Sequence, residues 1–344
     1  EQSLLETLER FNPNAPLELI FDYIRIRFPT TEVKYVIEHI LRLKLSYFLH
    51  EDYGFYSYSE HYALGDIFVL CSQEFNKGIL VELKGRGCRQ FEAYLLAQER
   101  SWYEFFMDAL SAGGVMKRLD LAINDRTGIL NIPLLTEKCR QEECISVFRS
   151  FKSYRSGELV RKDEKECMGN TLYIGSLQSE VYFCIYEKDY EQHKKNHIPI
   201  SEAEVKNRFE IRLKNERAYY AVRDLLIFDN PEQTAFKIIN RYIRFVDRDD
   251  NRPRCDWKLN DEWAWFIGNH RERLKLTTKP EPYTYERTLN WLARQVAPTL
   301  KVALKLDEIN QTQTVNTLLE HAKLTDKHRQ ILKQQSANIK DVIV

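Results

Sequence analysis

The stretch GNTLYIGSLQSEVYFCIYEKDYEQ, residues 169–192, contains the alternation that decides the fold. Within it, Val181, Phe183 and Ile185 alternate with polar or aromatic side chains, which is the period of a strand with one buried face. The same period recurs at 78–84, 118–124 and 205–214. These segments predict an antiparallel sheet with one apolar and one polar face.

The polar face of this predicted sheet carries an unusual set of side chains. Three of its strands have a carboxylate in the middle, Glu82, Asp120 and Glu210, and the fourth ends in Tyr186. One interpretation is a simply solvated face. The other is that the three carboxylates converge on Mg²⁺ or Mn²⁺, and that Tyr186 attacks a phosphodiester held there. A phenol with a pKa near 10 needs a nearby cation, such as Lys188 or the metal, to react at neutral pH.

Composition bounds the class of protein. The chain has 344 residues, of which 43% are hydrophobic, with no apolar run long enough for a membrane helix. The formal net charge is zero, so DNA binding would depend on local basic patches. Seven cysteines without a CxxC spacing favour a reduced, cytoplasmic location. None of the eight histidines forms the His-hydrophobe-His spacing of histidine-based relaxases, and no Walker A loop is present.

Three ordered motifs resemble a known family. GGVMKRLDLAIND (113–125), the stretch quoted above and NRFEIRLKNE (207–216) are similar to the Rep-trans family, which comprises rolling-circle replication initiators of staphylococcal-type plasmids and MobT relaxases. The run ILVELKGRGCRQFE (79–92) resembles the MobT branch, from integrative and conjugative elements, in particular.

The resemblance assigns roles to residues. It implies that Tyr186 is the nicking nucleophile, which becomes joined to a DNA 5′-phosphate and leaves a 3′-hydroxyl. It implies that Asp120 and Glu210 bind a divalent metal ion, Mg or Mn, with Glu82 as a third acidic position. Tyr190 is the alternative nucleophile, although it does not stand at the matching position.

Two positions depart from the family pattern. The plasmid initiators have an arginine two residues before the tyrosine, where this chain has Cys184, so phosphate contact must come from elsewhere. They also tend to have a second acid where this chain has Arg212, which leaves the number of metal ligands open.

The segment 147–162 interleaves aromatic and basic residues, a composition suited to phosphate contact with base stacking. It is interpreted either as an ordinary solvated hairpin or as a projection that grips DNA beside the nick. The predicted DNA contacts are Arg149, Lys152, Arg155, Arg161, Lys188 and Arg212.

The chain as a whole is therefore expected to be an α/β (α+β) protein with a central antiparallel sheet and a helical C-terminal region. Residues 1–17 are predicted to be a linker or a remnant of an upstream domain, 18–255 the catalytic domain and 256–344 the helical region. Further predictions are a strand at 53–58, a helix at 283–295 and a core of the helical region formed by Trp257, Trp263, Trp265 and Trp291.

The predicted function is a DNA relaxase that nicks one strand at an origin of transfer. A plasmid rolling-circle initiator with the same chemistry is the alternative, and a DNA-binding regulator that has lost nicking is a third reading. The resemblance further implies single-stranded DNA around the nick as a partner, a helper helicase and an upstream helix-turn-helix domain. We also expect a possible homodimer and no membrane partner.

Overall fold

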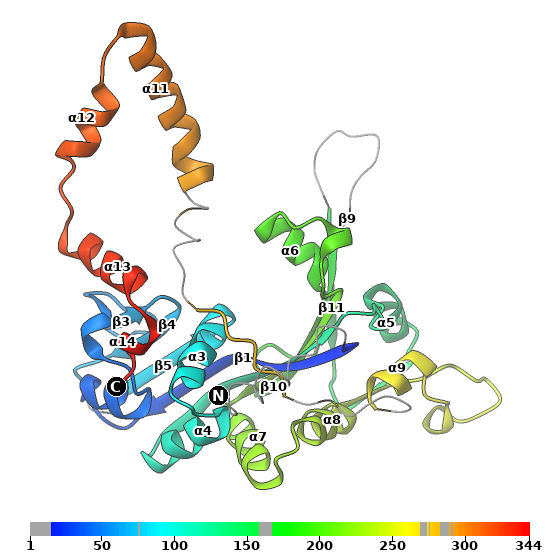
Figure 1. Cartoon of the computed structure of the whole chain (residues 1–344). Coiled ribbons are helices and arrows are strands. Elements are labelled where there is room, and N and C mark those ends of the chain that lie inside the picture. The colour runs from blue at the N-terminus through cyan, green and yellow to red at the C-terminus, as the bar shows by residue number, and fades with distance from the viewer. Residues whose placement is uncertain are drawn as a thin grey trace.

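A ten-stranded antiparallel sheet forms the centre of the computed structural model, which describes residues 15–74, 76–157, 167–268, 274, 276–282, 289 and 292–344. The strand order is β2-β3-β4-β5-β1-β6-β11-β10-β9-β8 (Figure 1). The strands are β1 (Leu17–Phe28), β2 (Leu49–Glu51), β3 (Glu60–Leu64), β4 (Ile67–Cys71), β5 (Ile79–Lys84), β6 (Val115–Asp125), β8 (Phe151–Gly157), β9 (Cys167–Ile174), β10 (Val181–Glu187) and β11 (Asn207–Lys214). The predicted fold class is confirmed.

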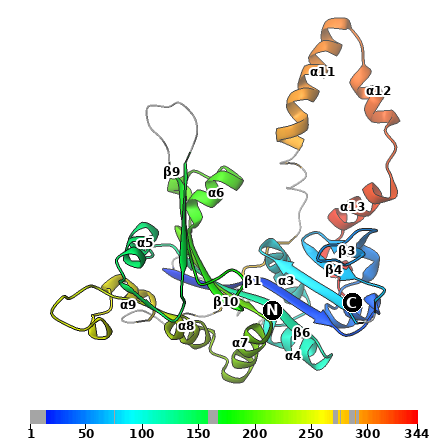
Figure 2. The same ribbon diagram turned by 180° about the vertical axis from the view of Figure 1, so that it is seen from behind.

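Helices cover the apolar face of the sheet. The helices inserted between strands are α2 (Val33–Tyr35), a π-helical turn (Val36–Ile40), α3 (Arg86–Ala97), α4 (Trp102–Ser111), α5 (Ile132–Arg140), α6 (Lys188–Asn196), α7 (Asn215–Phe228) and α8 (Pro231–Tyr242), and α9 (Asp261–Phe266) follows the last strand. Helices α4, α7, α8 and α9 lie along one side of the sheet in both views (Figures 1 and 2). Phe21 of β1 packs edge-on against Trp102 of α4, with ring centroids 5.3 Å apart. Among the described residues, the opposite face of the central strands carries the polar side chains, and α6 contacts it beside Tyr186; this face is called the open face below.

Two β-bulges interrupt the pairing of β1 with β6. The first lies between Phe21 and Tyr23, because Phe21 pairs with Leu121 and Tyr23 with Asp120, which leaves Asp22 as an extra residue. The second lies between Arg25 and Ile26, which pair with Arg118 and Met116 and leave Lys117 extra. A bulge lets two successive side chains leave the regular alternation of a strand. Both bulges therefore add a polar side chain near the open face.

A C-terminal segment covers part of the edge of β1. Strand β5 pairs with β1 only from Tyr23 onward, so the first residues of β1 have a free edge on that side. There Leu276 forms a parallel bridge with Leu19, and the Thr277 amide donates to the Leu19 carbonyl at 2.7 Å. The backbone groups of an exposed edge strand are thereby satisfied.

The remaining helices form the predicted helical C-terminal region. They are a π-helical turn (Leu292–Val296), α11 (Ala297–Asn310), α12 (Thr314–His321), α13 (Asp326–Ser336) and α14 (Ile339–Val342). The chain then returns to its N-terminal half (Figure 1). Gln334 of α13 donates to the carbonyls of Tyr47 and Ala63 at 2.7 and 2.9 Å, and the Lys44 amide donates to the Val342 carbonyl at 2.8 Å. The predicted domain boundaries after residues 17 and 255 stay predictions.

Some local expectations differ from the structure. Residues 53–58 form a loop between β2 and β3, and the predicted strand is wrong, because Tyr56 and Ser57 have φ of 54° and 63°, which a strand excludes. The predicted helix at 283–295 lies mostly outside the described residues. None of the described helices combines the length and apolarity that crossing a bilayer requires.

The tryptophans occupy different environments. Trp263 is buried and packs 4.8 Å from Phe245 and 6.2 Å from Phe209 of β11, so it joins the core of the sheet as well as α9. Trp265 packs against the same core, and Trp257 is half-buried. Trp291 lies outside the described residues.

The predicted hairpin at 147–162 is only partly described. Its first arm includes β8, the edge strand of the large sheet. The residues before it form β7 (Cys144–Ser146), which pairs with β12 (Ile243–Phe245) in a separate two-stranded sheet.

Candidate active site

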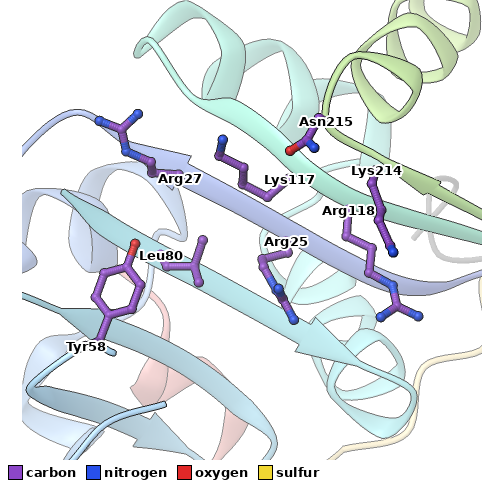
Figure 3. A pocket seen from close by; sticks show the side chains of 8 residues that line it. All are labelled: Arg25, Arg27, Tyr58, Leu80, Lys117, Arg118, Lys214 and Asn215. Atoms are coloured by element: carbon purple, nitrogen blue, oxygen red, sulfur yellow. The ribbon is translucent and has the colours of Figure 1, made fainter. Parts of the chain in front are cut away.

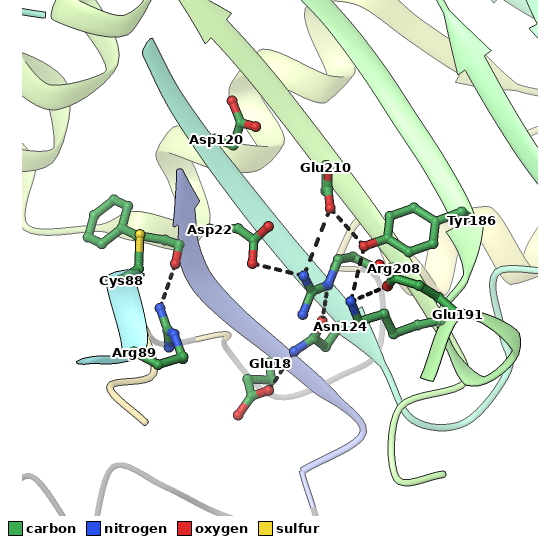
Figure 4. Close-up of polar contacts among 12 residues, drawn as sticks. Glu18, Asp22, Cys88, Arg89, Asp120, Asn124, Tyr186, Glu191, Arg208 and Glu210 are labelled. Atoms are coloured by element: carbon green, nitrogen blue, oxygen red, sulfur yellow. Dashed lines mark hydrogen bonds and ion pairs between the residues drawn. The ribbon is translucent and has the colours of Figure 1, made fainter. Parts of the chain in front are cut away.

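Tyr186 and Glu210 are joined by a hydrogen bond on the open face of the sheet (Figure 4). Tyr186 lies opposite Arg208 in the pairing of β10 with β11, which makes Glu210 its diagonal neighbour on the same face. The phenol donates to Glu210 Oε1 at 2.9 Å, and Lys188 Nζ donates to the phenol oxygen at 3.3 Å. The nucleophile predicted from the sequence thus has a proton acceptor on one side and a cation on the other.

The surroundings of Tyr186 oppose its spontaneous ionisation. Burial raises the pKa of Tyr186 well above 10, the nearby Arg208 lowers it, and the Glu210 charge raises it. Burial also lowers the pKa of Lys188, an effect that Glu191 counteracts by pairing with its ammonium group. The phenol therefore stays protonated at rest, and its proton must be removed during a reaction.

Asp120 and Glu210 lie together, and each is held by an arginine. Arg118 donates to both oxygens of Asp120, at 2.9 and 2.7 Å. Arg212 donates to Glu210 Oε2 at 2.9 and 2.6 Å, and its Nε lies 3.8 Å from Asp120 Oδ2. Burial raises the pKa of Asp120 to about 6, against the opposing effect of Arg118. The two neighbouring carboxylates are thus neutralised by two guanidinium groups.

Asp22 is a site residue that the sequence reasoning missed. The first bulge turns its side chain toward the open face, where it accepts a hydrogen bond from Arg208 at 2.9 Å. Arg208 also donates to Asn124 at 2.7 Å and lies 3.9 Å from Glu210 Oε1. The β1 residues that join the hydrophobic core are 17, 19 and 21 and then 24, 26 and 28. This change of phase is what a bulge produces.

Glu82 lies apart from the other two acids. It is on β5 and accepts hydrogen bonds from Tyr23 at 2.5 Å and from Arg25 at 3.0 Å. Strands β1 and β6 separate β5 from β11, so Glu82 and Glu210 lie three strand spacings apart, about 14 Å. The structure brings together Asp120 and Glu210 but not Glu82, whose assignment as a ligand stays a prediction.

The donor set suits a cation that is shared with substrate. Within the described residues, no group of three or more His, Cys, Asp or Glu side chains is placed to hold a metal ion. Asp120 and Glu210 nevertheless offer the carboxylate oxygens that Mg²⁺ and Mn²⁺ prefer, and Mg²⁺ is commonly bound by one or two carboxylates together with substrate phosphates. The two acids fit a jointly held ion rather than a closed protein cage.

The predicted basic contacts are spread over both faces of the edge strand. Arg149 is exposed in the bend before β8, and Lys152 is exposed in register with Tyr173, on the face that also carries Tyr186. Arg155 is exposed on the other face of β8, because it is an odd number of residues from Lys152. Arg161 lies outside the described residues.

The other two positions singled out in the sequence have packing roles in the structure. Tyr190 of α6 lies over the backbone of β9, where a Cβ at Gly169 would come within 2.8 Å of the Tyr190 Cβ. Cys184 is buried, and burial raises the pKa of its thiol to about 12. Where the plasmid initiators have an arginine at this position, this chain has Arg208 and Arg212 on the adjacent strand, on either side of Glu210.

The fold and the site can now be compared with those of known proteins. The chain belongs to the Replication initiation factor family, which matches residues 114–319, and residues 18–108 match the N-terminal domain of rolling circle replication initiation proteins.

Two similar proteins extend this comparison. A Bacillus subtilis (strain 168) protein described as "Putative DNA relaxase NicK" is 41% identical over 331 residues, covering 96% of this chain and 93% of that protein. The solved structure of a rolling circle replication initiator protein from Geobacillus stearothermophilus matches with a TM-score of 0.65 and 26% identity, over 76% of this chain and 99% of the other.

Proposed function

We propose that this protein is a DNA relaxase that nicks one strand at an origin of transfer through a covalent bond to Tyr186. The observation that carries the proposal is the hydrogen bond from the Tyr186 phenol to Glu210, with Lys188 on the same oxygen. Family membership and the similarity to a relaxase and to an initiator support it.

The reaction would be a transesterification at phosphorus. Glu210 Oε1 takes the phenolic proton, while Lys188 and Arg208 stabilise the developing phenolate. The Tyr186 oxygen forms a bond to the scissile phosphorus as the bond from phosphorus to the 3′-oxygen breaks. The 3′-oxygen takes up a proton, and the 5′-phosphate remains on the tyrosine. The phosphotyrosine conserves the bond energy for later religation.

A divalent ion, Mg²⁺ or Mn²⁺, would be held by Asp120 and Glu210, which lie together, while Glu82 lies apart from them and stays a predicted third ligand. When bound, it would neutralise negative charge on the scissile phosphate. Arg118 and Arg212 hold the two acids in place, and their guanidinium groups would suit contact with the same phosphate.

A plasmid rolling-circle initiator is the second candidate, because the same first step would prime replication from the 3′-hydroxyl. It is favoured by the match to the Geobacillus stearothermophilus initiator, and the relaxase is favoured by the higher identity to the Bacillus subtilis protein. A helper helicase, proposed on the family resemblance alone, and a homodimer are further partners that we propose. A DNA-binding regulator without nicking is the remaining alternative.

The decisive experiment is covalent capture. Labelled single strands tiled across the DNA that flanks the gene would be incubated with the protein and Mn²⁺, and denaturing gels would detect protein joined to DNA. We expect an adduct with the wild type and with Tyr190→Phe, and none with Tyr186→Phe. An adduct formed by Tyr186→Phe but not by Tyr190→Phe would overturn the assignment of the nucleophile.

The same assay separates the function classes. A wild-type protein that binds these strands but never forms an adduct would be a regulator. Religation of the adduct to a second strand, together with transfer of a plasmid that carries the nicked site, would distinguish a relaxase from an initiator.

A further inference from the structure

A basic groove lies on the open face of the sheet (Figure 3). It includes Lys214, at the opposite end of β11 from Arg208, which pairs with Tyr186. It has a volume of about 340 Å³, and no carboxylate lines it. Its cationic lining residues are Arg25, Arg27, Lys117, Arg118 and Lys214. None of them belongs to the basic segment at 147–162.

The bulges of β1 and β6 concentrate this charge. At the second bulge, Lys117 is the extra residue beside Arg118, so two consecutive cations line the same groove. Lys214 of β11 is in register with Arg118, which in turn is in register with Arg25 of β1. The charges therefore form a row across three neighbouring strands.

Three of these cations are available to an external anion. Arg25 and Arg118 are paired with Glu82 and Asp120. Arg27 and Lys214 instead donate to backbone carbonyls, and Lys117 makes no ion pair within the described part of the chain. The groove thus has a surplus of positive charge without a protein anion to balance it.

An aromatic loop stands beside the groove. The loop between β2 and β3 exposes Tyr53, Phe55 and Tyr56, which are 54%, 44% and 52% accessible. The Arg25 guanidinium lies over the Tyr56 ring, 4.0 Å from its centroid. Tyr56 and Ser57 adopt left-handed φ values, a conformation that costs energy for residues other than glycine and tends to persist at functional sites.

We propose that this groove and the aromatic loop bind an unpaired segment of the DNA strand that is being nicked. Arg27, Lys117 and Lys214 would contact successive phosphates, and Phe55 and Tyr56 would stack on bases. A basic groove beside exposed aromatic rings is the arrangement that binds single strands without sequence preference. The identity of the strand rests on the proposed nicking function.

The position of the groove sets how far that segment reaches. Lys214 lies six residues along β11 from Arg208, which is opposite Tyr186, and at about 3.3 Å per residue this is about 20 Å. A DNA strand that is bound both at Tyr186 and in the groove must continue beyond the scissile phosphate across the open face. Arg27, Lys117 and Lys214 therefore contact phosphates beyond those that the reacting residues would touch.

The test measures binding of oligo-dT, labelled at one end and ranging from about 4 to about 16 nucleotides, by fluorescence anisotropy over a range of salt. The groove variant is Lys117→Ala/Lys214→Ala. Two lost phosphate contacts should reduce the magnitude of the slope of log K against log salt concentration by about 1.4. They should also weaken binding about 25-fold at about 0.1 M salt. Tyr56→Ala should weaken binding about fivefold or more, through lost stacking.

The matched control is Lys34→Ala/Lys237→Ala, which removes the same charge from two side chains that are 74% and 66% exposed on α2 and α8. Its affinity and salt slope should equal those of the wild type. A groove variant within twofold of this control would overturn the proposal, and so would equally tight binding of a blunt duplex of the same length. Adduct formation by the wild type reports on the nicking proposal separately, because it does not enter the anisotropy comparison.

Discussion

The replacement Asp22→Asn tests whether the bulge in β1 supports the active site. Asp22 Oδ1 lies 2.9 Å from Arg208, whose side chain is only 10% exposed. Removing one partner of a buried ion pair costs about 3 to 5 kcal/mol. Asp22 itself is 21% exposed and the asparagine can still accept a hydrogen bond, so we expect a smaller loss, about 2 kcal/mol of unfolding free energy.

The pH dependence of this loss has a definite sign. Burial raises the pKa of Asp22, but the charge of Arg208, helped by Lys188 and Arg89, outweighs it, and the folded-state pKa is lowered. A lowered folded-state pKa gives stability that is present above the unfolded value, about 3.9, and is lost as the pH falls through the folded value. The difference in unfolding free energy between wild type and variant should therefore be largest at neutral pH and decrease in acid.

Urea unfolding, followed by tryptophan fluorescence at pH 7 and in acid, measures both quantities. The control is Asp326→Asn, which alters an ion pair with Arg329 in which the aspartate is 98% exposed. Such surface pairs contribute about 0 to 1 kcal/mol. An Asp22→Asn loss no larger than that of the control, or one that stays constant into acid, would refute the reasoning.

Three further predictions concern the reaction itself. Adduct formation by the wild type should fall as the pH drops below about 6, because Asp120 then becomes protonated and loses the charge that would hold a divalent ion. If the rate of adduct formation by Asp120→Asn showed the same fall below about pH 6, the assignment would be contradicted. Replacing Lys188 by Met removes the cation 3.3 Å from the phenol oxygen, so the pH at which adducts form fastest should rise, and an unchanged profile would exclude this role. The triple variant Arg149→Ala, Lys152→Ala and Arg155→Ala should bind origin DNA more weakly, with a flatter salt dependence, and unchanged affinity in a gel-shift titration would rule out this surface.

The strands that carry the site could be predicted because their signal is local. A period of two residues places Phe209 and Ile211 on one face of β11 and Glu210 on the other, and the structure buries Phe209 and Ile211 in the core. The same argument placed Tyr186 at the end of β10 on the face of Glu210. Each of these statements needs only the residues of one strand and its immediate neighbour.

What could not be predicted depends on strand order and register. The sequence shows that Glu82 and Glu210 each sit in the middle of a polar face, but not that two strands separate them. It also hides Asp22, because a polar residue within LELIFDYIRIRF has meaning only when the partner strand skips it.

The arginines of the site neutralise the two acids and are also suited to bind phosphate. Asp120 and Glu210 are buried, and a buried charge needs a partner, which Arg118 and Arg212 supply. The same guanidinium groups are well suited to bind the phosphate of an incoming strand. If an arginine left its carboxylate to bind a phosphate, the carboxylate would become an unpaired buried charge. Another cation must therefore take the place of the arginine. The proposed chemistry meets that condition if DNA and a divalent ion arrive together. If a divalent ion is bound, Arg212, which stands where the family tends to have an acid, would disfavour binding of the ion alone and would couple metal binding to substrate.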